Sequence, residues 1–98
     1  MYTIETTQVF DDWFDALRDK QTRSRIVVRI RRAELGNFGD CKPVGEGVSE
    51  MRIHAGAGYR LYFKKVGNTW VILLAGGDKS TQQRDIETAL ALARTVKE

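Results

Sequence analysis

The stretch GYRLYFK, residues 58–64, alternates apolar and polar side chains in the manner of a β-strand. Successive side chains of a strand point to opposite faces, so this stretch has one apolar and one polar face. The apolar face consists of Tyr59, Leu61 and Phe63. The polar face consists of Arg60, Tyr62 and Lys64. A row of guanidinium, phenol and ammonium groups suits a phosphate backbone whose bases stack on an aromatic ring, so this face predicts a nucleic-acid surface.

Strong bases and no acids surround this strand. Between Met51 and Gly77 there is no Asp or Glu, and the bases are Arg52, Arg60, Lys64 and Lys65. His54, the only histidine of the chain, lies among them. Neighbouring positive charge favours the neutral imidazole, which suits a general base. Lys79 follows the next predicted strand and is expected to add charge at the same edge of the sheet. The region predicts a site for metal-free phosphodiester chemistry.

Hydrophobic patterns predict a strand and two helices before this region. Residues 2–6 alternate and contain β-branched side chains, which predicts a first strand. Apolar stripes at helical spacing predict a helix capped by Thr6 or Thr7, and a second helix over 20–35 that ends at Gly36. The two helices are expected to form an antiparallel hairpin. The buried side of the second helix is predicted to consist of Ile26, Val27, Ile30 and Ala33.

The second half of the chain predicts an antiparallel meander and a final helix. Glycines and the only proline, Pro43, mark residues 36–47 as a loop. Three strands are predicted, at 48–54, 59–65 and 70–75. The last of them is apolar without alternation, which is typical of a strand covered on both faces. Ser80 and Gln83 fit a capping box that starts the final helix.

Length and composition predict a small single α+β domain over residues 1–98. Because 42% of the residues are hydrophobic and 30% are charged, the chain can build a core and is not disordered. A single cysteine, Cys41, cannot form an internal disulfide, so we expect a reducing, cytoplasmic environment. No apolar run approaches the ~20 residues that span a bilayer, and no signal pattern opens the chain, so no membrane partner is expected.

A second basic surface is predicted on the second helix. Arg25, Arg29 and Arg32 lie at helical spacing and share one face. Such a face is either solvated or docked against a polyanion, and the sequence leaves both interpretations open. One His, one Cys and no paired carboxylates near the basic strands give no support for a metal, and none is predicted.

Four segments, taken in order, resemble the addiction-module killer proteins, a HigB-like branch of the RelE/ParE toxin superfamily. They are GNFGD at 36–40, EMRI at 50–53, GYRLYF at 58–63 and GGDKSTQ at 76–82. The resemblance implies a RelE-like fold with an antiparallel sheet and a ribosome-dependent mRNA endonuclease that uses no cofactor. It also implies a small helix-turn-helix antitoxin, and contact with operator DNA only through the toxin–antitoxin complex.

The resemblance assigns roles to individual residues. Arg60 matches the arginine of a tyrosine-arginine strand motif that contacts the scissile phosphate. Arg52 matches a basic position on the preceding strand, and His54 follows it on the same face. Lys79 matches a basic residue after the final strand. Relatives carry a catalytic tyrosine or histidine near the C-terminus, and this chain has neither after Phe63.

The sequence therefore predicts a toxin-type RNase that cleaves mRNA by attack of the 2′-hydroxyl on the adjacent phosphate. Arg52, Arg60 and Lys79 would stabilise the phosphorane, and His54 or Lys79 would take the 2′-proton. The RNA would be held by Tyr62, which stacks on a base, by Lys64, and by the helix arginines Arg25, Arg29 and Arg32 docked on ribosomal RNA. The alternative is a ParE-like binding module that poisons DNA gyrase without chemistry.

Overall fold

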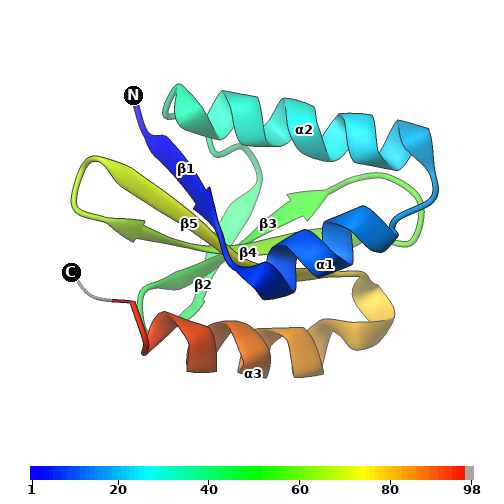
Figure 1. The fold of residues 1–98 in the computed structure, drawn as a ribbon. Helices are drawn as coiled ribbons and strands as arrows, with labels where there is room; N and C mark the ends of the chain where they lie inside the picture. The colour runs from blue at the N-terminus through cyan, green and yellow to red at the C-terminus, as the bar shows by residue number, and fades with distance from the viewer. Residues whose placement is uncertain (97–98) are drawn as a thin grey trace.

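The computed structural model describes residues 1–96, which build one five-stranded sheet with helices on both faces (Figure 1). Helices α1 and α2 cover one face, and α3 covers the other. The predicted α+β class and RelE-like arrangement are confirmed. In chain order the elements are β1 (Thr3–Thr6), α1 (Gln8–Ala16), α2 (Lys20–Glu34), β2 (Cys41–Gly45), β3 (Val48–Ile53), β4 (Tyr59–Val66), β5 (Trp70–Gly77), the 3₁₀ turn η1 (Lys79–Thr81) and α3 (Gln82–Ala93).

The strands lie in the order β1-β5-β4-β3-β2. Strands β2 to β5 follow one another as antiparallel hairpins, and β1 pairs with β5 in parallel. In the β3–β4 pair, Arg52 lies directly opposite Arg60. Because cross-strand neighbours have Cβ atoms about 5 Å apart, this register brings the two predicted phosphate-binding arginines together.

The meander has four strands, so the prediction of three was wrong. Strand β2 lies inside the predicted loop 36–47 and pairs with β3, with a shift of register between Pro43 and Gly45. Proline cannot donate a hydrogen bond to a neighbouring strand, but an edge strand needs no donor on its outer side. Strand β2 is such an edge strand. It was not predicted because its proline and the glycines around it are typical of loops.

The helix ends follow local signals. The hydroxyl oxygen of Thr7 accepts a hydrogen bond from the Phe10 amide at 3.1 Å, so Thr7 is the cap of α1. Helix α2 ends at Glu34, and Gly36 follows with φ of +90°, the left-handed conformation of a helix stop. Helix α2 runs in the direction opposite to α1, so the two helices have the predicted antiparallel arrangement (Figure 1). Both helices pack on the same face of the sheet.

The start of the last helix differs from the prediction. Asp78 and Thr81 form a capping box around η1, and α3 begins at Gln82. Ser80 donates to the Asp78 carboxylate rather than capping the helix. Asp78 is the cap because its carboxylate accepts hydrogen bonds from several donors of the first turn, here from the amide and the hydroxyl of Ser80.

Two hydrophobic clusters hold the layers together. The cluster beneath α1 and α2 is centred on Phe10, Ile26, Met51, Leu61, Phe63 and Leu73. The cluster beneath α3 contains Val48, Tyr62, Leu74, Ala75, Ala89 and Ala93. Val27 was predicted to be buried but is 36% exposed, because it lies one position further round the helix than Ile26. The polar face of residues 58–64 is therefore partly covered: α3 packs over its middle.

Two glycines at the end of β5 let the helices approach the sheet. A β carbon at Gly76 would overlap the ring of Trp13 on α1, and one at Gly77 would overlap the carboxylate of Asp85 on α3. This glycine pair is thus a packing feature that brings both helix layers close to the carboxyl end of β5.

Candidate functional site

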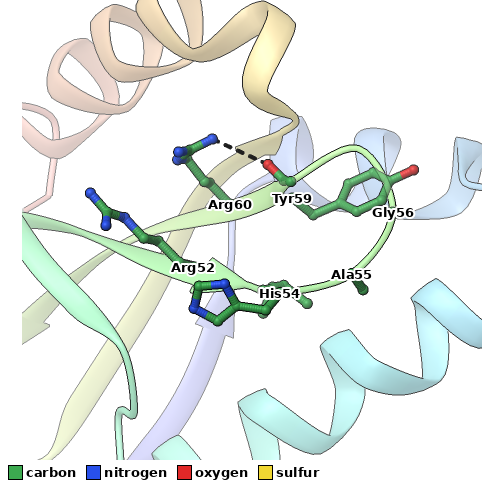
Figure 2. A pocket seen from close by; sticks show the side chains of 8 residues that line it. Arg52, His54, Ala55, Gly56, Tyr59 and Arg60 are labelled. Atoms are coloured by element: carbon green, nitrogen blue, oxygen red, sulfur yellow. Dashed lines mark hydrogen bonds between the residues drawn. The ribbon is translucent and has the colours of Figure 1, made fainter.

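A hollow of about 370 Å³ lies at the turn between β3 and β4 (Figure 2). Its lining consists of Arg52, Ile53, His54, Ala55, Gly56, Gly58, Tyr59 and Arg60. Gly56 and Gly58 have φ of +53° and +76°, so this turn needs the conformational freedom of glycine. In Figure 2 the side chains of Arg52 and Arg60 extend side by side, while the Tyr59 ring points away from them. Three of the four predicted catalytic residues therefore share one hollow.

Lys79, the fourth predicted catalytic residue, lies next to the same turn. A β carbon at Gly58 would lie 3.5 Å from Cβ of Lys79 and 3.9 Å from Nη1 of Arg60. The backbone amide of Lys79 also donates to the carbonyl of Ala57 at 3.3 Å. The exposed Lys79 side chain thus starts at the Arg60 side of the turn, as expected for a base after the last strand.

A buried carboxylate, Glu50, lies between the two arginines. Its Oε2 atom is 3.0 Å from Nε of Arg52, and its Oε1 atom is 3.6 Å from Nε of Arg60. Gln82 of α3 donates to Oε1 at 3.3 Å, and Glu50 has no exposed surface. The Arg60 Nη1 atom donates to the Gly58 carbonyl at 3.2 Å. The guanidinium groups are consequently held in place before any ligand binds.

Sequence reasoning missed Glu50 because it precedes the acid-free stretch by one residue. The signal was nevertheless present. Glu50 and Arg52 are two residues apart on a predicted strand, which places them on one face, and a lone acid beside clustered bases indicates an ion pair.

Tyr62 does not reach the surface, so the prediction that it stacks on a base was wrong. The residue has no exposed area and packs beneath α3. Its hydroxyl has no hydrogen-bond partner among residues 1–96. Burial, with smaller contributions from the charges of Glu50 and Asp85, raises the pKa of Tyr62 to about 12. The alternation correctly placed Tyr62 opposite Leu61, but it could not show that a helix covers that face.

Tyr59 is an aromatic residue that lines the hollow. Its ring is half-buried and lies 6.4 Å from the Trp13 ring, centre to centre. Strand alternation had assigned Tyr59 to the apolar face. Because it is the first residue of β4, its ring lies at the open end of the core.

His54 is paired with an acid in addition to lying near the basic residues of the site. Its Nε2 atom lies 2.6 Å from Oδ2 of Asp40, and both side chains are exposed. The carbonyl of Asp40 accepts from the amide of Arg52 at 2.9 Å, which fixes the loop beside β3. The positive charges expected around His54 are present, since Arg52 and Arg60 share one hollow with it. The pairing with Asp40 was not predicted, because Asp40 is distant in the sequence and was assigned to a loop.

The arginines of α2 adjoin His54, in a second hollow of about 340 Å³. Its lining consists of Ser24, Arg25, Val28, Arg29, Arg32, Ile53 and His54. The three arginines share one face, as predicted, but that face is not separate from the strand cluster. Helix α2 packs across the sheet, so residues distant in the chain meet at the end of β3.

Arg29 contributes to the fold in addition to its charge. Its Nη1 atom donates to the carbonyl of Arg52, and its Nη2 atom donates to the carbonyl of Phe38 at 3.1 Å. Burial is the main cause that lowers the pKa of Arg29. The side chain therefore joins α2 to β3 and to the loop before β2.

Lys64 lies at the other end of β4. It is opposite Val48 of β3 and Ile72 of β5, and a β carbon at Gly47 would be 3.6 Å from its Cε. Lys64 lines neither hollow, so the structure does not place it with the predicted site residues that line them.

Two kinds of feature are absent from the described part of the chain, residues 1–96. This part of the chain contains no group of three or more His, Cys, Asp or Glu side chains that could hold a metal ion. It also contains no helix that is long and apolar enough to cross a membrane.

The fold and the clustered bases define a small RelE-like protein. The family model described as Phage derived protein Gp49-like (DUF891) matches residues 12–98, and the chain belongs to this family. A protein of Haemophilus influenzae, described as an uncharacterized protein, is 48% identical over 91 residues, which cover 93% of this chain and 92% of the relative. The Gp49-like family is a toxin family of toxin–antitoxin systems of the RelE and HigB type, which implies an antitoxin partner.

Proposed function

We propose that this chain is a HigB-like toxin that cleaves mRNA on the ribosome without a metal ion. One observation carries the proposal: Arg52, His54 and Arg60 line one hollow, with Lys79 at its rim. Two guanidinium groups, an imidazole and an ammonium group are the chemistry that a transferring phosphate needs, since they supply charge stabilisation and proton transfer.

The reaction would begin at the ribose next to the scissile phosphate. His54 takes the proton of the 2′-hydroxyl, and the 2′-oxygen forms a bond to phosphorus in line with the 5′-oxygen. The bond from phosphorus to the 5′-oxygen breaks, and the leaving oxygen takes a proton from Lys79. The products are a 2′,3′-cyclic phosphate and a 5′-hydroxyl. Arg52 and Arg60 stabilise the charge that develops on the phosphorane oxygens.

Asp40 supports the assignment of His54 as the base. An acid 2.6 Å from one ring nitrogen orients the imidazole and stabilises the imidazolium that forms when the other nitrogen takes a proton. This arrangement supports His54, rather than Lys79, as the group that takes the 2′-proton. It also makes Asp40 a positioning residue, because it acts through His54.

The ribosome would supply the orientation of the message, so the isolated protein is expected to cleave slowly. The antitoxin is proposed to be a small helix-turn-helix protein that covers the basic hollows, and the complex is proposed to bind operator DNA. Lys64 is proposed to contact the RNA outside the two hollows. An acidic surface on the antitoxin would give an affinity that weakens as salt concentration rises.

The test is primer extension on a reporter message in a translating extract, with the purified chain added. We expect discrete cleavage positions, with a 5′-hydroxyl on the downstream fragment, and we expect His54→Ala to abolish them. Intact messages together with gyrase-dependent DNA breaks would instead support a ParE-like poison. Cleavage that is unaffected by both His54→Ala and Arg60→Lys would place the chemistry elsewhere.

A further inference from the structure

The two hollows of the basic surface meet at Ile53 and His54. Both residues line the hollow at the β3–β4 turn, and both also line the hollow against α2. His54 is exposed, so its imidazole lies at the surface where the two hollows meet. A flexible chain that lies in the first hollow can continue past the imidazole into the second.

The second hollow is lined by three arginines of α2. Arg25 and Arg32 are exposed, and the structure gives neither side chain an ion pair within residues 1–96. The acid at the junction of the hollows is Asp40, which is hydrogen-bonded to His54. A polyanion is therefore the ligand that this surface attracts.

Arg29 holds the two hollows in one fixed arrangement. It lies in the α2 hollow, yet its Nη1 atom donates to the carbonyl of Arg52, whose side chain lines the other hollow. Its second bond, to the Phe38 carbonyl, fixes the loop that carries Asp40. A ligand that spans both hollows thus meets a surface that is already formed, which lowers the entropy cost of binding.

Single-stranded RNA fits this surface better than an acidic peptide. Val28, which is 45% exposed between the arginines, offers an apolar patch for a base or a ribose. Tyr59 offers a ring in the first hollow. A nucleic acid repeats phosphates along its length and can occupy both hollows with the same chemistry, while its bases and riboses can contact the apolar and aromatic groups beside the arginines.

We propose that Arg25 and Arg32 bind phosphates of the same RNA strand whose scissile phosphate lies at Arg60. The message then runs through both hollows and passes His54 between them. This inference rests on the proposed function, and it replaces the expectation that the helix arginines dock on ribosomal RNA apart from the message.

The test measures binding of RNA to the isolated chain, without ribosomes. The probe is a fluorescent single-stranded RNA with a 2′-deoxyribose at the cleaved position, so that it binds without reacting. The variant is the double substitution Arg25→Gln and Arg32→Gln. The control is Arg31→Gln, an exposed arginine on the same helix that lines neither hollow. A thermal melt checks the fold of each variant.

We expect the double variant to lose about tenfold in affinity for an oligonucleotide that spans both hollows. For the double variant, the slope of log K against the logarithm of salt concentration should decrease in magnitude by about 1.4, since each phosphate contact with a single strand contributes about 0.7. The control should bind like the parent. For a dinucleotide centred on the cleaved bond, which fills one hollow, the parent and the double variant should bind equally.

Three outcomes overturn the inference. In the first, the double variant binds RNA like the parent but sediments poorly with ribosomes, which assigns the arginines to ribosomal RNA. In the second, RNA binding is unchanged but affinity for poly-glutamate falls, which assigns them to an acidic protein segment. In the third, the control loses as much affinity as the double variant. If the extract shows no message cleavage while the double variant has the expected binding defect, the proposed reaction is wrong, but the inference that one RNA strand binds both hollows is supported.

Discussion

The Nε atom of Arg52 lies 3.0 Å from the Oε2 atom of Glu50, whose side chain has no exposed surface. The two residues are separated by one position on β3, so both side chains leave the same face of the sheet. Arg60, opposite Arg52 on β4, reaches the other oxygen of the same carboxylate at 3.6 Å. A single buried acid therefore positions both candidate phosphate-binding groups.

The first prediction concerns this carboxylate. Glu50→Gln keeps the shape of the side chain but leaves two guanidinium groups beside a neutral amide. Breaking a buried ion pair costs up to about 3–5 kcal/mol, and because Arg52 is one-third exposed we expect a loss of about 2–3 kcal/mol. Urea unfolding measures it. The control, Glu46→Gln, breaks the exposed Glu46–Arg94 pair and should cost much less. Equal losses would show that Glu50 has no special role in stability.

The second prediction separates the charge of Arg60 from its geometry. Its side chain is 14% exposed and lies between Glu50 and the Gly58 carbonyl, so Arg60→Ala would leave Glu50 with Arg52 as its one arginine partner and destabilise the fold. Arg60→Lys retains the charge but loses the planar array of donors. We expect Arg60→Lys to melt within a few degrees of the parent and yet fail to arrest growth after induction. A folded and fully toxic Arg60→Lys protein would remove Arg60 from the site.

The third prediction concerns the Asp40–His54 pair. Asp40→Asn removes the charge that stabilises the imidazolium, so cleavage in the translating extract should fall about tenfold or more. Asp40→Glu should restore part of the activity. The partial rescue by Asp40→Glu is a readout that a purely structural role would not give, and Lys42→Gln, a neighbouring exposed control, should cleave like the parent.

The fourth prediction concerns the buried phenol. Tyr62→Phe removes a hydroxyl that has no hydrogen-bond partner among residues 1–96, so stability at pH 7 should be unchanged or rise by up to about 1 kcal/mol. RNA binding should not change, because the ring lies beneath α3. The control is Tyr59→Leu, which should weaken RNA binding. The opposite ranking of the two variants would mean that α3 leaves the sheet when RNA binds.

The buried phenol of Tyr62 should also make the stability of the parent depend on pH in the alkaline range. The unfolded tyrosine ionises near pH 10, whereas burial keeps Tyr62 protonated in the folded state until about pH 12. The unfolded state thus releases the proton first, and the parent loses stability as pH rises from about 10 to 12. Tyr62→Phe should lose less stability over this range in urea titrations. Parallel curves for parent and variant would contradict the assignment.

The fifth prediction concerns the cap of η1. The Ser80 hydroxyl bond, supported by bonds from the Ser80 and Thr81 amides, holds the pKa of Asp78 below its ordinary value. Asp78→Ala should cost about 1 kcal/mol, or roughly 5 °C in Tm, at pH 7. The contribution is complete above the ordinary carboxyl pKa of about 4, and it fades as pH falls through the lowered native value. The difference in Tm between parent and variant should therefore shrink in acid, and a constant difference would argue against an ionised cap.

The sequence by itself determined the elements and the class of the fold. The 3.6-residue stripes of α1 and α2, the alternation of β4 and the left-handed glycine after α2 depend on neighbours within a few residues, and each was found where the pattern predicted it. The pairing of Arg52 with Arg60 depends on the register of β3 and β4, which the short turn between them restricts to few choices. Strand β2 was not predicted, because its proline is tolerated only in an edge strand, and which strand lies at the edge is decided by the assembled sheet.

Only the tertiary structure decided which polar groups face solvent and which acids meet which bases. Alternation assigned Tyr62 to the polar face, but whether α3 covers that face depends on how a helix far along the chain packs. The same holds for Asp40 beside His54, and for α2, whose arginines reach His54 across the sheet. These contacts join segments that are distant in sequence. Burial and charge pairing are properties of the packed layers, so no pattern confined to one segment could contain them.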